Sequence, residues 1–445
     1  MRTGELYLWV PYNLAVRAPP HSLPGDMKTL LWGALLSHSM FGRPSEISQF
    51  NGFLATGQHQ KAMQLFDQLS HDPNHCRLVL DSILMSNTNH HDPQLHTPHG
   101  LQTTEAARSM LAIAGFPTGV PLLRFVTLYS FSLRKRDITA EDVRLKAKTL
   151  PAYPNPVEPL YDAFTSGDFP NAGAILARIA VDQGIPAAAR AALRFALNDL
   201  GKLGHHLSLA VAYLEAARAL GLPRGLLPIA NLGFYLGEAM QGTKPSPIPP
   251  LEPDEVIPSG ARLREALEVS AFDEVESQLR ALVAAGQIDD AVRPLLVAAS
   301  ADPGFLGHTL VLAHSLRLGA PYLEPAENFY VLWKAYRTLV TRFGYPEFLR
   351  LGPSPSIDRE SVMEALRASL QYRTPPAETT LRQALEVGIP LDEILATIVN
   401  AYGQWTVGEK EHTIICLAAA IATARFLGKD DALLPLAVAL MRLPF

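Results

Sequence analysis

An internal repeat led by a histidine constrains this chain more than any other feature of its sequence. The segments that begin at His205 and His412 align with each other without a gap. The positions that coincide include Ala212 with Ala419, Ala217 with Ala424, Arg218 with Arg425, Gly221 with Gly428, and Leu227-Pro228 with Leu434-Pro435. Because self-similarity at a fixed period is the signature of repeat architectures, we expect several similar structural units.

Two looser copies of the same segment extend the repeat to four. They begin at His99 and His308, and Ala, Gly and Pro follow each histidine in the same order. The lead histidines are therefore separated by 106, 103 and 104 residues. We predict a capping segment followed by four tandem repeats of about 104 residues each, with the boundaries 1–43, 44–140, 157–242, 260–345 and 357–445.

Apolar periodicity within each unit predicts helices. Patterns such as Phe50-x-x-Phe53-Leu54 place apolar residues at positions i, i+3 and i+4, on one face of a helix. The lead histidine opens an Ala-rich helix, and a Leu-Pro pair opens the next one, because proline is tolerated in a first turn. No alternating pattern typical of strands occurs. The sequence predicts an all-α fold with about five helices per repeat, arranged as a closed ring or an open solenoid.

Composition argues against several classes of function. Apolar residues make up 48% and charged residues 18% of the chain, which is typical of a globular protein. The net charge is −5 and the basic residues are dispersed, so we expect no nucleic-acid partner. Only Cys76 and Cys416 are present, which excludes a disulfide framework and favours the cytoplasm. No apolar run predicts a membrane span, and no motif predicts a nucleotide cofactor.

The distribution of histidine is the strongest functional signal in the sequence. Of the 14 histidines, nine lie at or before position 99, and the other five all lie in the repeated segment. These five are His205, His206, His308, His314 and His412. Imidazole is therefore selected at one structural position of each repeat. Three interpretations stay open, namely a structural contact at a helix start, a metal site and a His-lined pocket without metal.

A metal site requires the four repeats to bring His99, His205, His308 and His412 together. The partial positive charge at a helix N-terminus disfavours imidazolium, and neutral imidazole is the form that binds a metal or accepts a proton. Three or four histidines suit Fe, Mn, Cu or Zn. In an open solenoid the histidines would instead lie more than about 15 Å apart, since each repeat advances by roughly the width of a helix pair.

Three further residues near the lead histidines are candidates for chemistry. His206 adjoins His205 and is a candidate catalytic residue on the same helix. Glu411 adjoins His412 and is a candidate catalytic base. Cys416 shares a helical face with His412, but a lone cysteine among apolar residues is more often a small buried side chain. The cluster Asn89-His90-His91-Asp92, with His96 and His99, has a metal-like composition, and a solvated loop is an equal alternative.

The segments GHHLSLAVAYLEAARALG and EHTIICLAAAIATARFLG resemble the His-led helices of questin-oxidase-like (Baeyer–Villiger-type) proteins and of helical proteins associated with Rieske domains. The resemblance covers the His-led helix and the Leu-Pro helix of each unit. It implies oxidative chemistry on an organic substrate, carried by the four lead histidines. The chain lacks the paired Cys and His ligands of a Rieske cluster, so an iron–sulfur partner would be another chain.

These observations favour a His-lined central pocket that holds a transition metal and oxidises a small apolar organic molecule. The alternative is a helical-repeat scaffold that binds a protein or peptide partner on a concave face, with structural histidines.

Overall fold

The computed structural model describes residues 44–92, 97–116, 118–198, 200, 202–252, 255–339, 351–352, 357–372, 375–405 and 411–442. The chain divides into one unit of residues 1–48 and a second of residues 49–445. The predicted capping segment 1–43 lies outside the described residues. The second unit contains helices α3 to α22 and the four lead histidines.

The described residues have an all-α structure of 21 α-helices, as predicted, and no strand occurs among them. A single isolated bridge pairs His90 with Lys135. No described helix is both long enough and apolar enough to cross a membrane. The helices of the first half are α2 (Pro44–Ala55), α3 (His59–Leu69), α4 (Pro73–Thr88), α5 (His99–Ala114), α6 (Val120–Ser132), α7 (Ala140–Thr149), α8 (Val157–Ser166), α9 (Phe169–Gln183), α10 (Ile185–Asn198), α11 (His205–Leu220) and α12 (Leu226–Ala239).

The second half continues in the same way, with short 3-10 turns beside some helices. The turns are η1 (Lys202–Gly204), η2 (Phe305–Gly307) and η3 (Ala320–Tyr322). The helices are α13 (Gly260–Glu268), α14 (Phe272–Ala284), α15 (Ile288–Ala301), α16 (His308–Gly319), α17 (Pro325–Leu339), α18 (Arg359–Tyr372), α19 (Ala377–Glu386), α20 (Leu391–Trp405), α21 (Glu411–Leu427) and α22 (Lys429–Arg442).

Each of the four predicted segments contains five of these described α-helices. The groups are α2–α6, α8–α12, α13–α17 and α18–α22, and α7 follows the first group. The number of helices per segment therefore agrees with the expected five. The repeat itself, and the choice between a ring and a solenoid, stay predictions.

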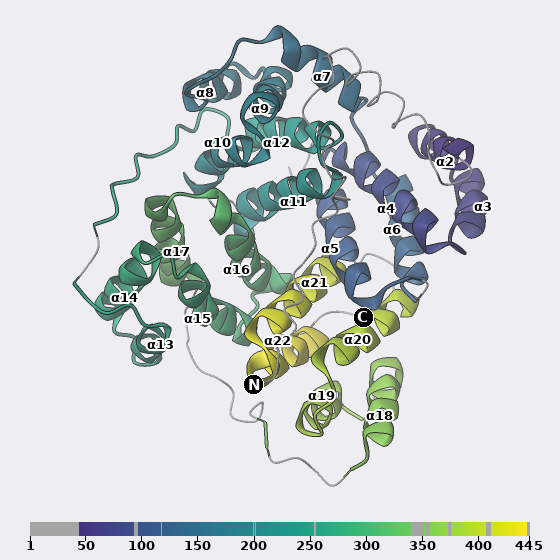
Figure 1. Ribbon diagram of the computed structural model, residues 1–445, viewed down its shortest axis with the longest axis vertical. Coiled ribbons are helices and arrows are strands. Elements are labelled where there is room, and N and C mark those ends of the chain that lie inside the picture. The colour runs from purple at the N-terminus through teal and green to yellow at the C-terminus, as the bar shows by residue number, and fades with distance from the viewer. Residues whose placement is uncertain are drawn as a thin grey trace, which may run out of the picture. The chain divides into compact units, whose positions relative to one another are not determined.

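Four helices with a lead histidine in their first turn pack against one another (Figure 1). Helix α5 contacts α11, α11 contacts α16, α16 contacts α21, and α21 contacts α5. Buried residues run round all sides of α11 and α21. Such helices lack a polar face and are stable only when other helices enclose them. The outer neighbours of α11 include α10 and α12, and α22 packs against α21.

The two Leu-Pro pairs differ in their place within a helix. Pro228 is the third residue of α12, in the first turn as predicted. The prediction is wrong for Pro435, because α22 begins at Lys429 and encloses this proline. Asp430 and Asp431 stabilise the earlier start, since they lie near the partial positive charge of the helix N-terminus. The missing N–H of Pro435 removes one backbone hydrogen bond without ending the helix.

Candidate metal centre

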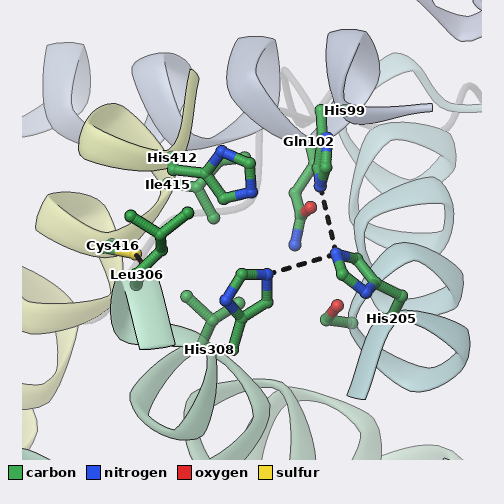
Figure 2. A pocket seen from close by; sticks show the side chains of 10 residues that line it. His99, Gln102, His205, Leu306, His308, His412, Ile415 and Cys416 are labelled. Atoms are coloured by element: carbon green, nitrogen blue, oxygen red, sulfur yellow. Dashed lines mark hydrogen bonds between the residues drawn. The ribbon is translucent and has the colours of Figure 1, made fainter. Parts of the chain in front are cut away.

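The four lead histidines lie side by side in the structure (Figure 2). Each imidazole ring neighbours two of the others, so the four rings form a closed sequence. The distances between ring centroids are 5.2 Å for His99–His205, 4.8 Å for His205–His308, 5.2 Å for His308–His412 and 4.6 Å for His412–His99. The wide separation expected for an open array, above about 15 Å, is therefore not observed.

The closest approach between ring nitrogens occurs at His205. Its Nε2 lies 3.2 Å from Nε2 of His99 and 3.3 Å from Nε2 of His308. A ring nitrogen from each of His99, His205 and His412 lies within 4.8 Å of the other two. Two nitrogen ligands of a tetrahedral ion with bonds of about 2.0–2.1 Å are about 3.3 Å apart. The two short contacts at His205 thus have the spacing of neighbouring ligands.

A hydrogen bond on the outer side of His308 fixes the position of its proton. Nδ1 of His308 lies 2.5 Å from the carbonyl oxygen of Phe305. Because a carbonyl only accepts, Nδ1 donates, and a neutral His308 presents a lone pair at Nε2. Nε2 of His205 carries at most one hydrogen, yet it faces two other nitrogens. A coordinated cation satisfies several converging lone pairs, which a single proton does not.

Burial favours the neutral form of two site histidines, His99 and His412. It lowers the pKa of His99 to about 2, with smaller contributions from His412, His205 and His308. The pKa of His412 is also lowered, first by burial and then by His308, while Glu411 opposes the shift. Since a metal ion competes with protons for imidazole, these shifts favour metal binding at neutral pH.

A left-handed backbone turn introduces two of the four histidines. Leu203 and Gly204, before His205, have φ values of 59° and 83°. Leu306 and Gly307, before His308, have φ values of 49° and 82°. Leucine rarely adopts this conformation, which costs a residue with a Cβ about 1–2 kcal/mol. The Leu-Gly-His triplet occurs at both places and is the sequence signal for this turn, which alignment of the lead histidines alone does not reveal.

Both glycines of these turns pack tightly against the next histidine-led helix. A Cβ on Gly204 would lie 2.8 Å from a side-chain atom of Leu312. A Cβ on Gly307 would overlap the Cys416 sulfur. Leu312 and Cys416 each lie four residues after the lead histidine of their own helix. A contact between the glycine before one helix and the fourth residue after the next lead histidine therefore occurs twice, between α11 and α16 and between α16 and α21.

A small cavity lies beside the four rings, with room for about one water molecule. Four of its lining residues lie three positions after a lead histidine, one on each helix, on the same helical face. The side chains that line the cavity besides the histidines are Gln102, Ser208, Leu306, Val311, Ile415 and Cys416. The cavity is therefore polar on the side of α5 and α11 and apolar on the side of α16 and α21. The sequence signal for these four lining residues is their spacing of three positions from a lead histidine, and they were not predicted as site residues.

Cys416 lines the cavity as a protonated thiol. Its sulfur donates a hydrogen bond to the carbonyl oxygen of Leu306. Burial raises its pKa to about 12. Because only the thiolate binds metal well, Cys416 lines the cavity without being a candidate ligand. This agrees with the small buried side chain expected from the sequence.

Neither predicted catalytic residue lines the cavity. His206 is turned by about 100° from His205 around the helix. Its ring packs edge-on against Tyr235, with a centroid distance of 6.4 Å. Glu411 is absent from the cavity lining and has a carboxylate oxygen 3.9 Å from Nδ1 of His412. Glu411 thus acts electrostatically on the His412 ring and does not face the cavity.

The Asn89–Asp92 cluster makes other contacts. Nδ1 of His90 accepts a hydrogen bond of 3.0 Å from the N–H of Gly100, in the first turn of α5. Nε2 of His91 lies 3.3 Å from a carboxylate oxygen of Glu238 on α12. His96 lies outside the described residues. Within the described part of the chain, no second group of His, Cys and acidic side chains converges on a possible ion.

No family model, curated protein or solved structure matches this chain. The resemblance to questin-oxidase-like and Rieske-associated proteins stays an expectation from the sequence. The geometry of the four histidines is therefore the basis for the function proposed below.

Proposed function

We propose that His99, His205, His308 and His412 bind one divalent transition-metal ion. The observation that carries this proposal is the convergence of imidazole nitrogens at His205, where two neighbours lie at 3.2 Å and 3.3 Å. These spacings fit ligands on one ion, and the proton fixed on Nδ1 of His308 leaves a lone pair directed inward. Small rotations of the rings would draw the wider pairs together around the ion.

The proposed arrangement around the ion is a closed set of four repeats, each giving one ligand. The contact between α5 and α21, which belong to the first and last predicted repeats, supports closure. The repeated packing of Gly204 on Leu312 and of Gly307 on Cys416 supports equivalent roles for α11, α16 and α21. In this arrangement every repeat is needed to complete the ligand set.

The reaction that we propose is oxidation of a small apolar organic molecule, whose electrons a redox-active ion at the site would pass on to an external oxidant such as dioxygen. The cavity has room for about one water molecule, so an organic substrate would bind outside the rings. Phe305, which is 69% exposed, stacks on the His308 ring with a centroid distance of 6.1 Å. Its exposed face is an apolar surface beside a proposed ligand, where such a substrate would dock.

A second candidate is a metal-free cluster in which neighbouring imidazoles share protons. The observation that favours it is the same pair of distances, since 3.2 Å and 3.3 Å also suit N–H···N hydrogen bonds. Such a cluster would transfer protons and would need no ion. The two candidates differ in their metal content, which can be measured directly.

The deciding experiment is elemental analysis of the full-length protein, purified without a histidine tag from metal-replete medium. We expect about one Fe, Mn, Cu or Zn per chain, because the four ligands form a single small site. His205→Ala and His308→Ala should each lose the ion while retaining helicity by circular dichroism. His206→Ala is the matched control, since it removes an adjacent histidine that does not line the cavity.

Two outcomes would overturn parts of this proposal. A protein without metal above background, even after dialysis against each of the four ions, would favour the proton-sharing cluster. Zinc as the sole bound ion would retain the metal site but remove the oxidative reaction, because zinc does not change its oxidation state. Loss of fold in both alanine variants would be resolved with His205→Gln and His308→Gln.

A further inference from the structure

The cavity beside the rings contains a buried amide whose hydrogen-bonding capacity is unused. Gln102 is 7% exposed, and its amide is directed toward the space between the rings (Figure 2). No hydrogen bond joins this side chain to any residue that the structure describes. The fully enclosed polar atoms that lack a partner do not include those of the Gln102 amide, so a small molecule in the cavity can reach this amide.

The position of Gln102 places it beside any ion held by the histidines. Gln102 follows His99 by three residues and therefore lies on the same face of α5. Ser208, which is also buried, has the same relation to His205 on α11. The equivalent residues on the other two helices are Val311 and Ile415, which have no hydrogen-bonding group in their side chains. The cavity is thus built asymmetrically, with donors on one side alone.

Resting on the proposed metal site, we propose that this cavity receives a ligand no larger than a small anion or a diatomic molecule. The ligand would coordinate the ion and accept a hydrogen bond from the Gln102 amide. An anion keeps further lone pairs after it gives one to the ion, so it can accept a hydrogen bond from the N–H groups of the Gln102 amide. Hydroxide and other anions of similar size have the required chemistry.

The size limit follows from the walls of the cavity. The free space accommodates about one water molecule. Val311 and Ile415 are branched at Cβ and therefore stiff, so this side does not open easily. Leu306 and Cys416 close the space beside His308 and His412. A ligand with an aromatic ring would have to displace these side chains and is excluded.

The test uses full-length protein loaded with Co²⁺, whose visible spectrum responds to a change of ligand. The Co²⁺ content is measured first, and fluoride, an anion of about the size of hydroxide, is then titrated as the probe. We expect fluoride to bind wild type, and Gln102→Met to bind it about tenfold more weakly while retaining its Co²⁺, because one buried hydrogen bond is lost. Ser208→Ala should cause a smaller loss. Thr103→Val is the matched control, since it removes a buried hydroxyl of α5 that does not line the cavity.

The outcomes separate this inference from the metal site itself. Wild type that binds no Co²⁺ would overturn the proposed function. Co²⁺ binding with equal fluoride affinity in wild type and Gln102→Met would overturn the role of Gln102 and leave the metal site intact. Benzoate that changes the spectrum as readily as fluoride would overturn the size limit. Fluoride binding that weakens equally in Thr103→Val would show that a general loosening of α5 is the cause.

Discussion

Three of the helices that carry a lead histidine, α5, α11 and α16, begin in two different ways. Before α11 and α16 the backbone passes through a left-handed Leu-Gly pair. Before α5 the chain enters through Pro98, with φ of −72°, and the His90 side chain accepts the N–H of Gly100. His99 and His205 nevertheless meet at 3.2 Å. Packing between helices therefore sets the position of the histidines. The local structure at each helix start differs, with a left-handed Leu-Gly turn at α11 and α16 and a side-chain hydrogen bond at α5.

The largest effect on stability is expected in the Leu306-Gly307 turn, where the left-handed glycine is also tightly packed. Gly307→Ala places a methyl group in a left-handed backbone and against the Cys416 sulfur. Strain and overpacking together should lower the free energy of unfolding by about 4 kcal/mol. Urea denaturation followed by circular dichroism measures this change.

The matched control is Gly428→Ala, which separates backbone strain from overpacking. Gly428 has a similar φ of 84°, but no atom lies within 4 Å of the position of an added Cβ. The alanine variant there should cost only about 1 kcal/mol, the strain alone. Equal losses in the two variants would show that the contact between Gly307 and Cys416 contributes nothing.

The hydrogen bond between His90 and Gly100 at the start of α5 should be sensitive to pH, unlike the Leu-Gly turns. Nδ1 of His90 accepts the N–H of Gly100 only while it carries no proton. Burial lowers the pKa of His90 to about 4, and Asp92 opposes this shift. As pH falls, the unfolded chain, with an ordinary pKa of about 6.5, binds the proton first. Stability is therefore lost between about pH 6.5 and pH 4, and about 2 kcal/mol should be lost between pH 7 and pH 5.

His90→Asn isolates this part of the pH dependence. The Asn side-chain oxygen is an acceptor that does not titrate, so the variant should lose less stability than wild type between pH 7 and pH 5. Urea midpoints at the two values measure the difference. The other buried histidines are present in both proteins, and their contributions cancel. Parallel pH profiles would mean that His90 does not hold the start of α5.

The smallest effect is expected at the exposed leucine of the first Leu-Gly turn. Leu203 has φ of 59° and is 44% exposed, so its side chain contributes little burial. Leu203→Gly relieves the left-handed strain but makes the unfolded chain more flexible. The net result should be a stabilisation of less than about 1 kcal/mol, seen as a slightly higher thermal midpoint. A marked destabilisation would show that the Leu203 side chain supports the turn.

The sequence was sufficient for the parts of the structure that depend on periodicity. Apolar residues at helical spacing predicted the all-α class. The shared position of the four lead histidines made their convergence one of two alternatives, the other being an open array in which they lie far apart. Whether His206 also faces the site could not be decided, since this depends on how α11 is rotated in its packing. That rotation turns His206 toward Tyr235. A metal role for the four rings remains a proposal.

Other features depend on contacts between distant segments and were not predictable. Nothing local makes Leu306 adopt φ of 49°, and the contact of Gly307 with Cys416 is made by residues far apart in the chain. The predicted start of α22 was wrong because the same Leu-Pro pair lies in the first turn of α12 and in the interior of α22. The pair alone does not distinguish the two positions. Burial of Gln102 without a partner likewise became visible only once four helices were placed together.

The contact between α5 and α21 has a consequence for biosynthesis. The cluster takes one histidine from α5 and another from α21, so it cannot form before α21 has been synthesised. Assembly of the four rings then requires the pairing of segments that are distant in the chain, which is slow. Proteolytic removal of α21 and α22 would abolish the site while most of the helices remain. An intact cluster therefore requires that both α5 and α21 have been made and have met.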